Sequence, residues 1–217
     1  MTIAVMATGA AAVVVAWRVV VSGLATVWVA VAVALGASAV ASLSTGRVSL
    51  SPRVAVLGAS LAGVGSGMLL YMATVAFVLV VRRWPVFDRH VAEIYDQRKG
   101  LSLGPALLIA AAVVAPSEEV FWRGLFQSRL ADAAGWPAAA ALTWVTYVVA
   151  NAASESLPIL AGAVVSGAVW GALALWTHGV LAGILCHSLW TALMVTWPPG
   201  GAATRNQPSR SGERSRP

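Results

Sequence analysis

The sequence predicts an all-α, polytopic membrane protein with six to seven transmembrane helices and a buried polar cavity. Of the 217 residues, 59% are hydrophobic and only 10% are charged, whereas soluble domains carry about 25% charged residues. Apolar runs of about 20 residues recur, and this is the length that a helix needs to cross a bilayer. Helices satisfy all their backbone groups within one segment, so we expect the spans to be helical.

Seven apolar segments are expected to form the spans. They cover residues 3–22, 24–43, 54–81, 101–117, 137–152, 158–176 and 179–197. Because Arg18 lies inside the first segment, residues 3–43 form either two spans or one span with an interfacial segment. The total is therefore six or seven. Pro105 and Pro116 allow the segment at 101–117 to bend.

Two polar stretches are expected to lie on the same side of the membrane. Residues 82–100, "RRWPVFDRHVAEIYDQRKG", mix charged and apolar residues and predict an amphipathic helix on the membrane surface. Residues 198–217 are rich in Pro, Gly, Ser and Arg and predict a disordered basic tail. Four spans separate the two stretches. Their excess of Lys and Arg predicts that both are cytoplasmic.

The same boundaries divide the chain into three parts. Residues 1–100 hold the N-terminal transmembrane helices and the basic surface loop, residues 101–197 hold the candidate catalytic core, and residues 198–217 form the tail.

The Arg-rich, Lys-poor composition suggests a bacterial protein of the plasma membrane. The basic residues lie in loops and the tail, where membrane topology explains them, so no nucleic acid partner is expected.

Small residues recur at spacings that favour close helix packing. Gly63, Gly65 and Gly67 cluster in one span, and Gly167 and Gly171 form a GxxxG pattern in another. Packing within the fold is the simpler interpretation, and a dimer interface is the alternative. The oligomeric state stays open.

An acidic motif, "APSEEVFWRG" (115–124), lies between long apolar runs. Ionisable groups are costly at membrane depth and are therefore candidates for function. On a helix, Glu119 and Arg123 lie on one face and form a favourable pair. Glu118 points about 100° away and has no partner in its own helix, which leaves it available as a general base. The alternative is that both acids lie at a helix end near the membrane interface.

Two later spans each contribute a polar pair with a spacing of four residues. Tyr147 and Asn151 form one pair, and His187 and Thr191 form the other. Three polar clusters in three apolar spans predict one shared site.

The depth of Glu118 in the membrane limits how these clusters can meet. If residues 101–117 crossed the membrane straight from the cytoplasmic side, Glu118 would emerge near the far face. The clusters could then meet only through bent or tilted helices.

The motif "EEVFWRG" resembles the EExxxR motif of the CAAX-protease and bacteriocin-processing (CPBP, or Abi) family of intramembrane endopeptidases. The family's second and third motifs are FxxxH and HxxxN. Tyr147–Asn151 and His187–Thr191 stand at the corresponding distances, and "LALWTHGVLAGILCHSLW" is similar to the stretch before the last motif. Asn151 replaces the family's His, and Thr191 replaces its Asn.

The resemblance implies six site residues, namely Glu118, Glu119, Arg123, Asn151, His187 and Thr191. Glu118 would activate a water molecule that Asn151 orients. His187 and Thr191 would stabilise the oxyanion, and Glu119 with Arg123 would brace the helix. Both zinc-dependent and metal-free mechanisms are argued for the family. Since Asn is a poor zinc ligand, no cofactor is expected and zinc is disfavoured.

Three functions are consistent with these residues. The first is an intramembrane endopeptidase that cleaves a membrane-associated or prenyl-like substrate or a small exported peptide. The second is an inactive relative that binds a peptide or a membrane protein as a scaffold or immunity factor, which the replacements at Asn151 and Thr191 favour. A small transporter or channel is the third, and the chain lacks the internal repeat that many transporters show.

Overall fold

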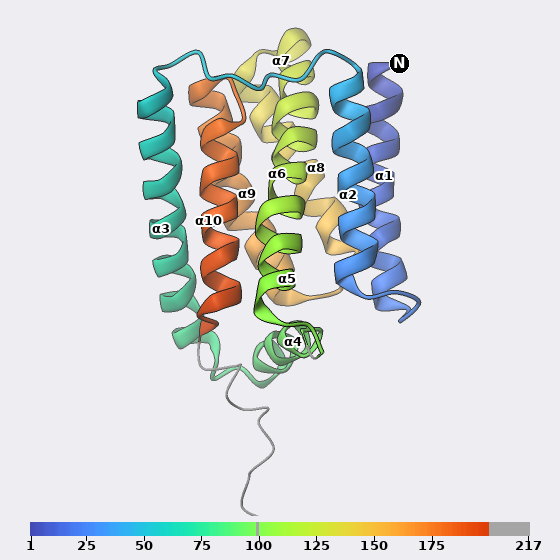
Figure 1. The fold of residues 1–217 in the computed structure, drawn as a ribbon, viewed down its shortest axis with the longest axis vertical. Helices are drawn as coiled ribbons and strands as arrows, with labels where there is room; N and C mark the ends of the chain where they lie inside the picture. Colours follow the sequence, from blue (N-terminus) through green and yellow to red (C-terminus); the bar gives the residue numbers. More distant parts are fainter. Residues whose placement is uncertain (99, 200–217) are drawn as a thin grey trace, which may run out of the picture.

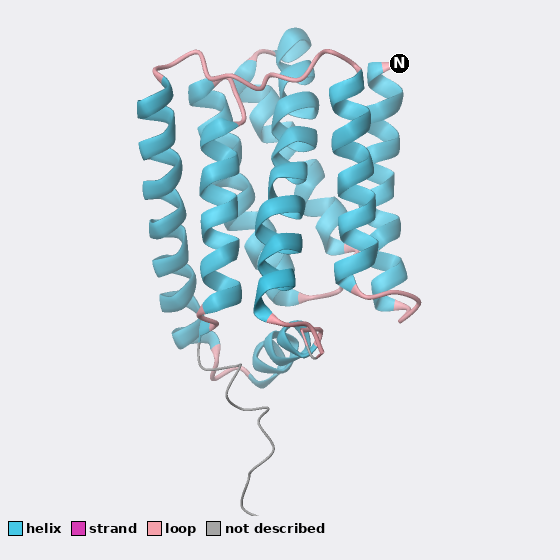
Figure 2. Ribbon diagram, in the orientation of Figure 1, coloured by secondary structure: helices cyan, strands magenta, loops and turns pink. Residues whose placement is uncertain are grey.

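The computed structural model describes residues 1–98 and 100–199, which form a bundle of roughly parallel helices (Figure 1). These residues contain helices and loops but no strand (Figure 2). The bundle holds α1 (Thr2–Val21), α2 (Val27–Ser44), α3 (Val56–Val81), α8 (Trp136–Ala152), α9 (Leu157–Thr177) and α10 (Leu181–Thr196). The predicted tail from residue 200 onwards lies outside the described residues.

One long helix holds the acidic motif and runs from Leu103 to Ala134, a length of 32 residues. It consists of α5 (Leu103–Leu107), η1 (Leu108–Val114), α6 (Ala115–Glu119), η2 (Val120–Gln127) and α7 (Ser128–Ala134), where η marks π-helical turns. The predicted boundary at residue 117 was therefore wrong. The charges after it do not end the helix because they are buried against other helices, and the chain turns only at Gly135, whose φ is +78°.

The all-α, polytopic architecture is confirmed. Within the described residues, five helices are long and apolar enough to cross a membrane: α1, α2, α3, the helix from Leu103 to Ala134, and α9. The sixth apolar helix, α10, has 16 residues, and α8 lies in the bundle beside these helices (Figure 1). Arg18 lies in the last turn of α1 and forms an exposed ion pair with Glu155. Residues 3–43 therefore hold two helices, each long enough to span.

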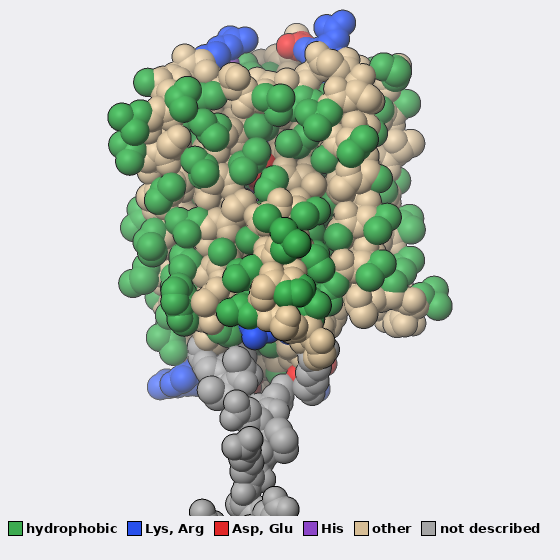
Figure 3. Space-filling model, viewed as in Figure 1, with side chains coloured by type: hydrophobic (Ala, Val, Ile, Leu, Met, Phe, Trp, Pro, Cys, Tyr) green, Lys and Arg blue, Asp and Glu red, His purple; other side chains and the backbone are tan. Residues whose placement is uncertain are grey.

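The amphipathic helix expected in residues 82–100 is present as α4 (Pro85–Asp96). It lies at the end of the bundle where α3 ends (Figure 1), and it buries Phe87 and Val91. The Tyr95 hydroxyl donates to the carbonyl of Met194 over 3.2 Å and ties α4 to α10. Hydrophobic side chains cover the middle of the visible face, and Lys and Arg gather at its two ends (Figure 3), as expected of a chain that spans a membrane.

The glycine clusters serve packing within the fold. A Cβ at Gly63 would lie 2.6 Å from the Ala182 carbonyl oxygen, so this glycine brings α3 against α10. A Cβ at Gly167 would lie 2.9 Å from the Tyr147 ring, so the GxxxG pattern brings α9 against α8. Gly65 faces open space. The glycine clusters therefore have the role that the simpler interpretation gave them, which is helix packing within the fold.

Gly67→Ala is expected to destabilise the fold by about 1–3 kcal/mol, the usual cost of overpacking. A Cβ there would lie 2.8 Å from the backbone oxygen of Cys186, which cannot move without separating α3 from α10. Thermal unfolding in detergent measures the loss. Gly65→Ala, in the same helix, is the matched control and is expected to leave the melting temperature unchanged or higher, because alanine favours helix. Equal losses in both variants would contradict this packing.

Candidate active site

The acidic pair lies in the middle of its helix. Glu118 and Glu119 close α6, and each is about 22–24 Å from both ends of the long helix at a rise of roughly 1.5 Å per residue. Glu118 is 7% exposed and Glu119 is fully buried. The alternative that both acids lie near a helix end is therefore wrong. A span that ended at residue 117 would have placed Glu118 near the far face of the membrane. Because the helix continues to Ala134, Glu118 lies near its middle instead.

Glu119 and Arg123 form the expected pair, with Arg123 Nη1 3.3 Å from Glu119 Oε1. Nη2 of Arg123 donates to the Gly167 carbonyl over 3.1 Å, and the guanidinium lies over the Tyr147 ring, 4.7 Å from its centroid. One turn later, Gln127 Nε2 donates to the Gly171 carbonyl over 3.1 Å. These side chains fasten the long helix to α9. Gln127 was not predicted, although its spacing of four from Arg123 places it on the same face.

His187 joins the pair from α10. Its Nδ1 lies 3.0 Å from Glu119 Oε1. Since an ionised carboxylate only accepts hydrogen bonds, Nδ1 carries the hydrogen and Nε2 is left for another partner. The imidazole stacks on Trp170 of α9, with centroids 3.6 Å apart and planes at 17°. Trp170 was not predicted either, because no spacing singles it out among the ten tryptophans.

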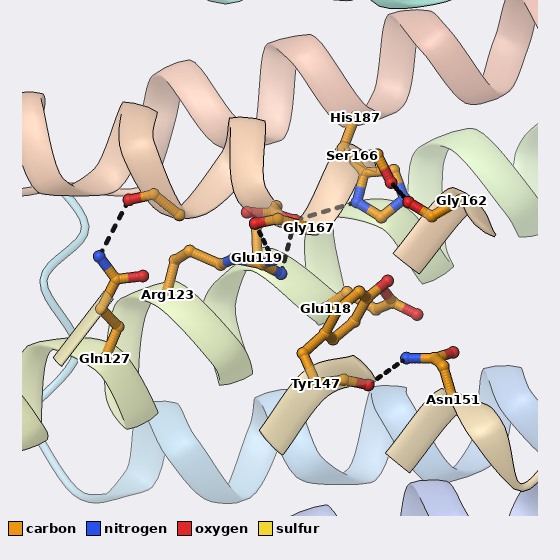
Figure 4. A network of polar contacts seen from close by, with 11 residues as sticks. Glu118, Glu119, Arg123, Gln127, Tyr147, Asn151, Gly162, Ser166, Gly167 and His187 are labelled. Atoms are coloured by element: carbon orange, nitrogen blue, oxygen red, sulfur yellow. Dashed lines mark hydrogen bonds and ion pairs between the residues drawn. The ribbon is translucent and has the colours of Figure 1, made fainter. Parts of the chain in front are cut away.

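Glu118 finds its partner on another helix. The Tyr147 hydroxyl of α8 donates to Glu118 Oε2 over 2.8 Å, and the two side chains lie side by side in Figure 4. Glu118 thus has no partner within its own helix, as expected. The hydroxyl that holds it is the group that separates Tyr147 from the phenylalanine of the family motif, so this replacement adds a hydrogen bond to the site.

Asn151 lies one turn beyond Tyr147 and is 3% exposed. Its Nδ2 donates to the Tyr147 carbonyl over 2.9 Å (Figure 4). Its Oδ1 accepts a hydrogen bond of 3.1 Å from the indole Nε1 of Trp17, which belongs to α1. The contact brings together residues that are 134 positions apart.

Thr191 is the sixth predicted residue and lies apart from the others. It is half-buried one turn after His187, and it does not line the cavity that opens beside the other predicted residues. The structure therefore brings five of the six predicted residues together. An oxyanion role for Thr191 stays a prediction that no described contact supports.

A cavity of about 540 Å³ opens beside these residues. Its polar wall holds Glu118, Tyr147, Asn151 and His187. The rest is mostly apolar and comes from several helices, with Leu70 and Phe77 on α3, Phe87 and Val91 on α4, Trp170 on α9, and Trp190 and Met194 on α10. The cavity therefore extends from the acidic motif to the surface helix α4.

The side chains of the site do not fit a metal ion. Within residues 1–98 and 100–199, no group of three or more His, Cys, Asp or Glu side chains is placed to hold one. Glu119 Oε1 and His187 Nδ1 face each other, and Arg123 also binds Glu119. Asn151 supplies an amide where a histidine ligand would be needed.

The comparisons with known proteins agree with this geometry. Residues 101–193 match the family model described as type II CAAX prenyl endopeptidase Rce1-like. No curated protein and no solved structure matches the chain. The matched residues include the EExxxR motif and both later polar pairs. The match confirms the resemblance to the CPBP, or CAAX-protease, family: over residues 101–193, the chain is similar to the Rce1-like type II CAAX prenyl endopeptidases.

Proposed function

We propose that the chain is an intramembrane endopeptidase of the CPBP type that uses Glu118 to activate water. One observation carries the proposal: the Glu118 carboxylate is buried in the wall of an apolar cavity, where Tyr147 binds only one of its oxygens. The second oxygen is available to a water molecule. The family match over residues 101–193 supports peptide-bond hydrolysis as the reaction.

The reaction proceeds by general-base catalysis. Glu118 takes a proton from water as the water oxygen bonds to the carbonyl carbon of the substrate. The carbonyl oxygen becomes an oxyanion. Collapse of this intermediate breaks the C–N bond, and Glu118 returns the proton to the leaving nitrogen. The products are a carboxylic acid and an amine, and every step uses groups of this chain, water and the substrate.

The second carboxylate supports the first. Glu119 is neutralised by Arg123 and bound by His187, so its charge does not stand unbalanced beside Glu118. His187 lines the cavity with Nδ1 held by Glu119. When the ring carries both protons, Nε2 donates a hydrogen bond to the developing oxyanion. Glu119 and Arg123 therefore act as the brace that holds His187 and the helix in place.

The cavity favours a membrane-associated peptide or protein as the substrate. Its wall beyond the polar groups is apolar and aromatic, which suits apolar side chains or an attached lipid chain. The substrate would reach the site from the lipid bilayer or from the side of α4. We place α4 in the cytoplasm of a bacterium, because its flanks carry Arg82, Arg83 and Arg98.

Tyr147→Phe is expected to lower kcat roughly tenfold while KM changes little, since a misplaced catalytic group affects the transition state more than binding. The variant restores the phenylalanine of the family motif and removes the hydrogen bond to Glu118 Oε2. Steady-state kinetics on reconstituted protein measures the change. Thr146→Val, which removes a hydroxyl on the outer side of α8, is the control. An equal fall in both variants would contradict a role for the Tyr147 hydroxyl.

The direct test of the proposal is cleavage in proteoliposomes. Purified full-length protein is incubated with a prenylated peptide and with the same peptide unmodified, and the products are identified by mass spectrometry. Release of a fragment from either peptide supports the endopeptidase, and the preference between them defines the substrate. Saturable binding without cleavage would instead support the alternative, an inactive relative that binds peptides as a scaffold or immunity protein.

A further inference from the structure

We propose that Trp17, on α1, is a positioning residue of this site: it holds the Asn151 carboxamide so that an N–H, rather than the C=O, faces a bound peptide carbonyl. The inference rests on the proposed function and deepens it. It assigns part of the site to a helix outside the matched residues 101–193, and it changes the role of Asn151 from orienting water to donating a hydrogen bond.

The hydrogen bonds determine which way the carboxamide points. An indole N–H is a donor only, so the atom that Trp17 contacts at 3.1 Å must be the carbonyl oxygen of Asn151. The opposite assignment would place two donors against each other. Nδ2 then faces the Tyr147 carbonyl at 2.9 Å, and this acceptor agrees with the same assignment. Both contacts are buried.

The remaining N–H is what Asn151 offers to the cavity. A carboxamide nitrogen carries two hydrogens, and the Tyr147 carbonyl accepts one of them. Oδ1 is already occupied by Trp17. Asn151 and Glu118 both line the cavity, and Tyr147 lies between them, with its hydroxyl bound to Glu118 and its backbone carbonyl bound to Asn151. A carbonyl oxygen bound beside Glu118 therefore meets a donor, which is what an oxyanion needs.

Removing the indole N–H releases this constraint. With phenylalanine at position 17, Oδ1 of Asn151 would lose its partner in a buried place, which favours rotation of the amide toward other donors. A rotated amide presents an acceptor to the substrate carbonyl and repels it. The cost falls on the developing oxyanion more than on substrate binding, so kcat is the quantity that Trp17 affects.

The first test needs no enzymatic activity. Full-length protein labelled with ¹⁵N-tryptophan in detergent micelles gives one indole N–H signal for each of the ten tryptophans, and Trp17→Phe and Trp144→Phe assign two of them. Asn151→Ala is expected to shift the Trp17 signal, since its acceptor is gone. The Trp144 signal is the control, because this indole donates to the Val164 carbonyl of α9 rather than to Asn151. An unmoved Trp17 signal would overturn the proposal.

The second test uses kinetics. Trp17→Phe is expected to lower kcat roughly 10- to 100-fold with little change in KM, while Trp144→Phe keeps the wild-type rate. In an Asn151→Ala background, Trp17→Phe is expected to cause no further loss, because the two residues act as one unit. Additive losses would show that Trp17 only fills space and would overturn the proposal. If the wild-type protein is inactive, that result refutes the proposed function but does not test the role of Trp17. The indole N–H signal of Trp17 would still decide whether it holds the Asn151 carboxamide.

Discussion

Glu118→Gln is expected to abolish measurable cleavage while the chain keeps its fold. Glutamine has the same shape, and its carbonyl oxygen still accepts the Tyr147 hydroxyl that now binds Glu118 Oε2 at 2.8 Å. Its amide cannot take a proton from water, so general-base catalysis is lost. We expect kcat to fall roughly 10²- to 10⁴-fold, which is the usual contribution of this effect.

Cleavage kinetics and thermal unfolding of the same preparation separate chemistry from folding. The matched control is Glu155→Gln, which neutralises the exposed carboxylate that pairs with Arg18 and is not among the residues that line the cavity, and it should cleave at the wild-type rate. A variant at position 118 that binds peptide normally but does not cleave it supports the role of a base. Cleavage at the wild-type rate by Glu118→Gln would exclude Glu118 as that base.

Arg123→Met is expected to have the largest effect on stability, a loss of about 3–5 kcal/mol in the free energy of unfolding. The variant leaves the Glu119 carboxylate without its cation in a place where neither side chain is more than 1% exposed. It also removes the donor to the Gly167 carbonyl, so α9 loses one of its attachments to the long helix. Methionine fills similar space, which restricts the loss to charge and hydrogen bonding.

Unfolding by titration with a denaturing detergent measures this loss. Arg18→Met is the control, since the Arg18–Glu155 pair is more than half exposed on both sides and should contribute at most about 1 kcal/mol. The double variant Glu119→Leu with Arg123→Met should be more stable than Arg123→Met alone, because it removes the unpaired charge. A double variant that is less stable than the single one would show that the ion pair is not the cause.

Much of the fold follows from local sequence patterns. Apolar runs of membrane-spanning length determine helices before any tertiary contact forms, because lipid leaves a backbone no other partners. The mixed charges of residues 82–100 likewise determine α4, whose apolar side turns to the bundle. The spacing of Glu119 and Arg123 determines their pair for the same reason, since residues four apart on a helix are neighbours.

Local sequence patterns do not predict where the long helix ends. They predict an end at residue 117, because charges after an apolar run normally mark the membrane edge. The structure continues it to Ala134, since α9 and α10 supply the Gly167 carbonyl and the His187 ring that make those charges tolerable. Whether a charge ends a span depends on its partners, and these come from distant parts of the chain.

The sequence by itself therefore determined the class of protein, most of the helices, the ion pair on one helix face and the residue types of the candidate site. Only the tertiary structure decided which groups meet: Tyr147 with Glu118, His187 with Glu119, and Trp17 with Asn151. The physical reason is the range of the interactions. Helix formation and i,i+4 pairing depend on neighbours along the chain, whereas a buried hydrogen bond between helices depends on how each helix is rotated and packed.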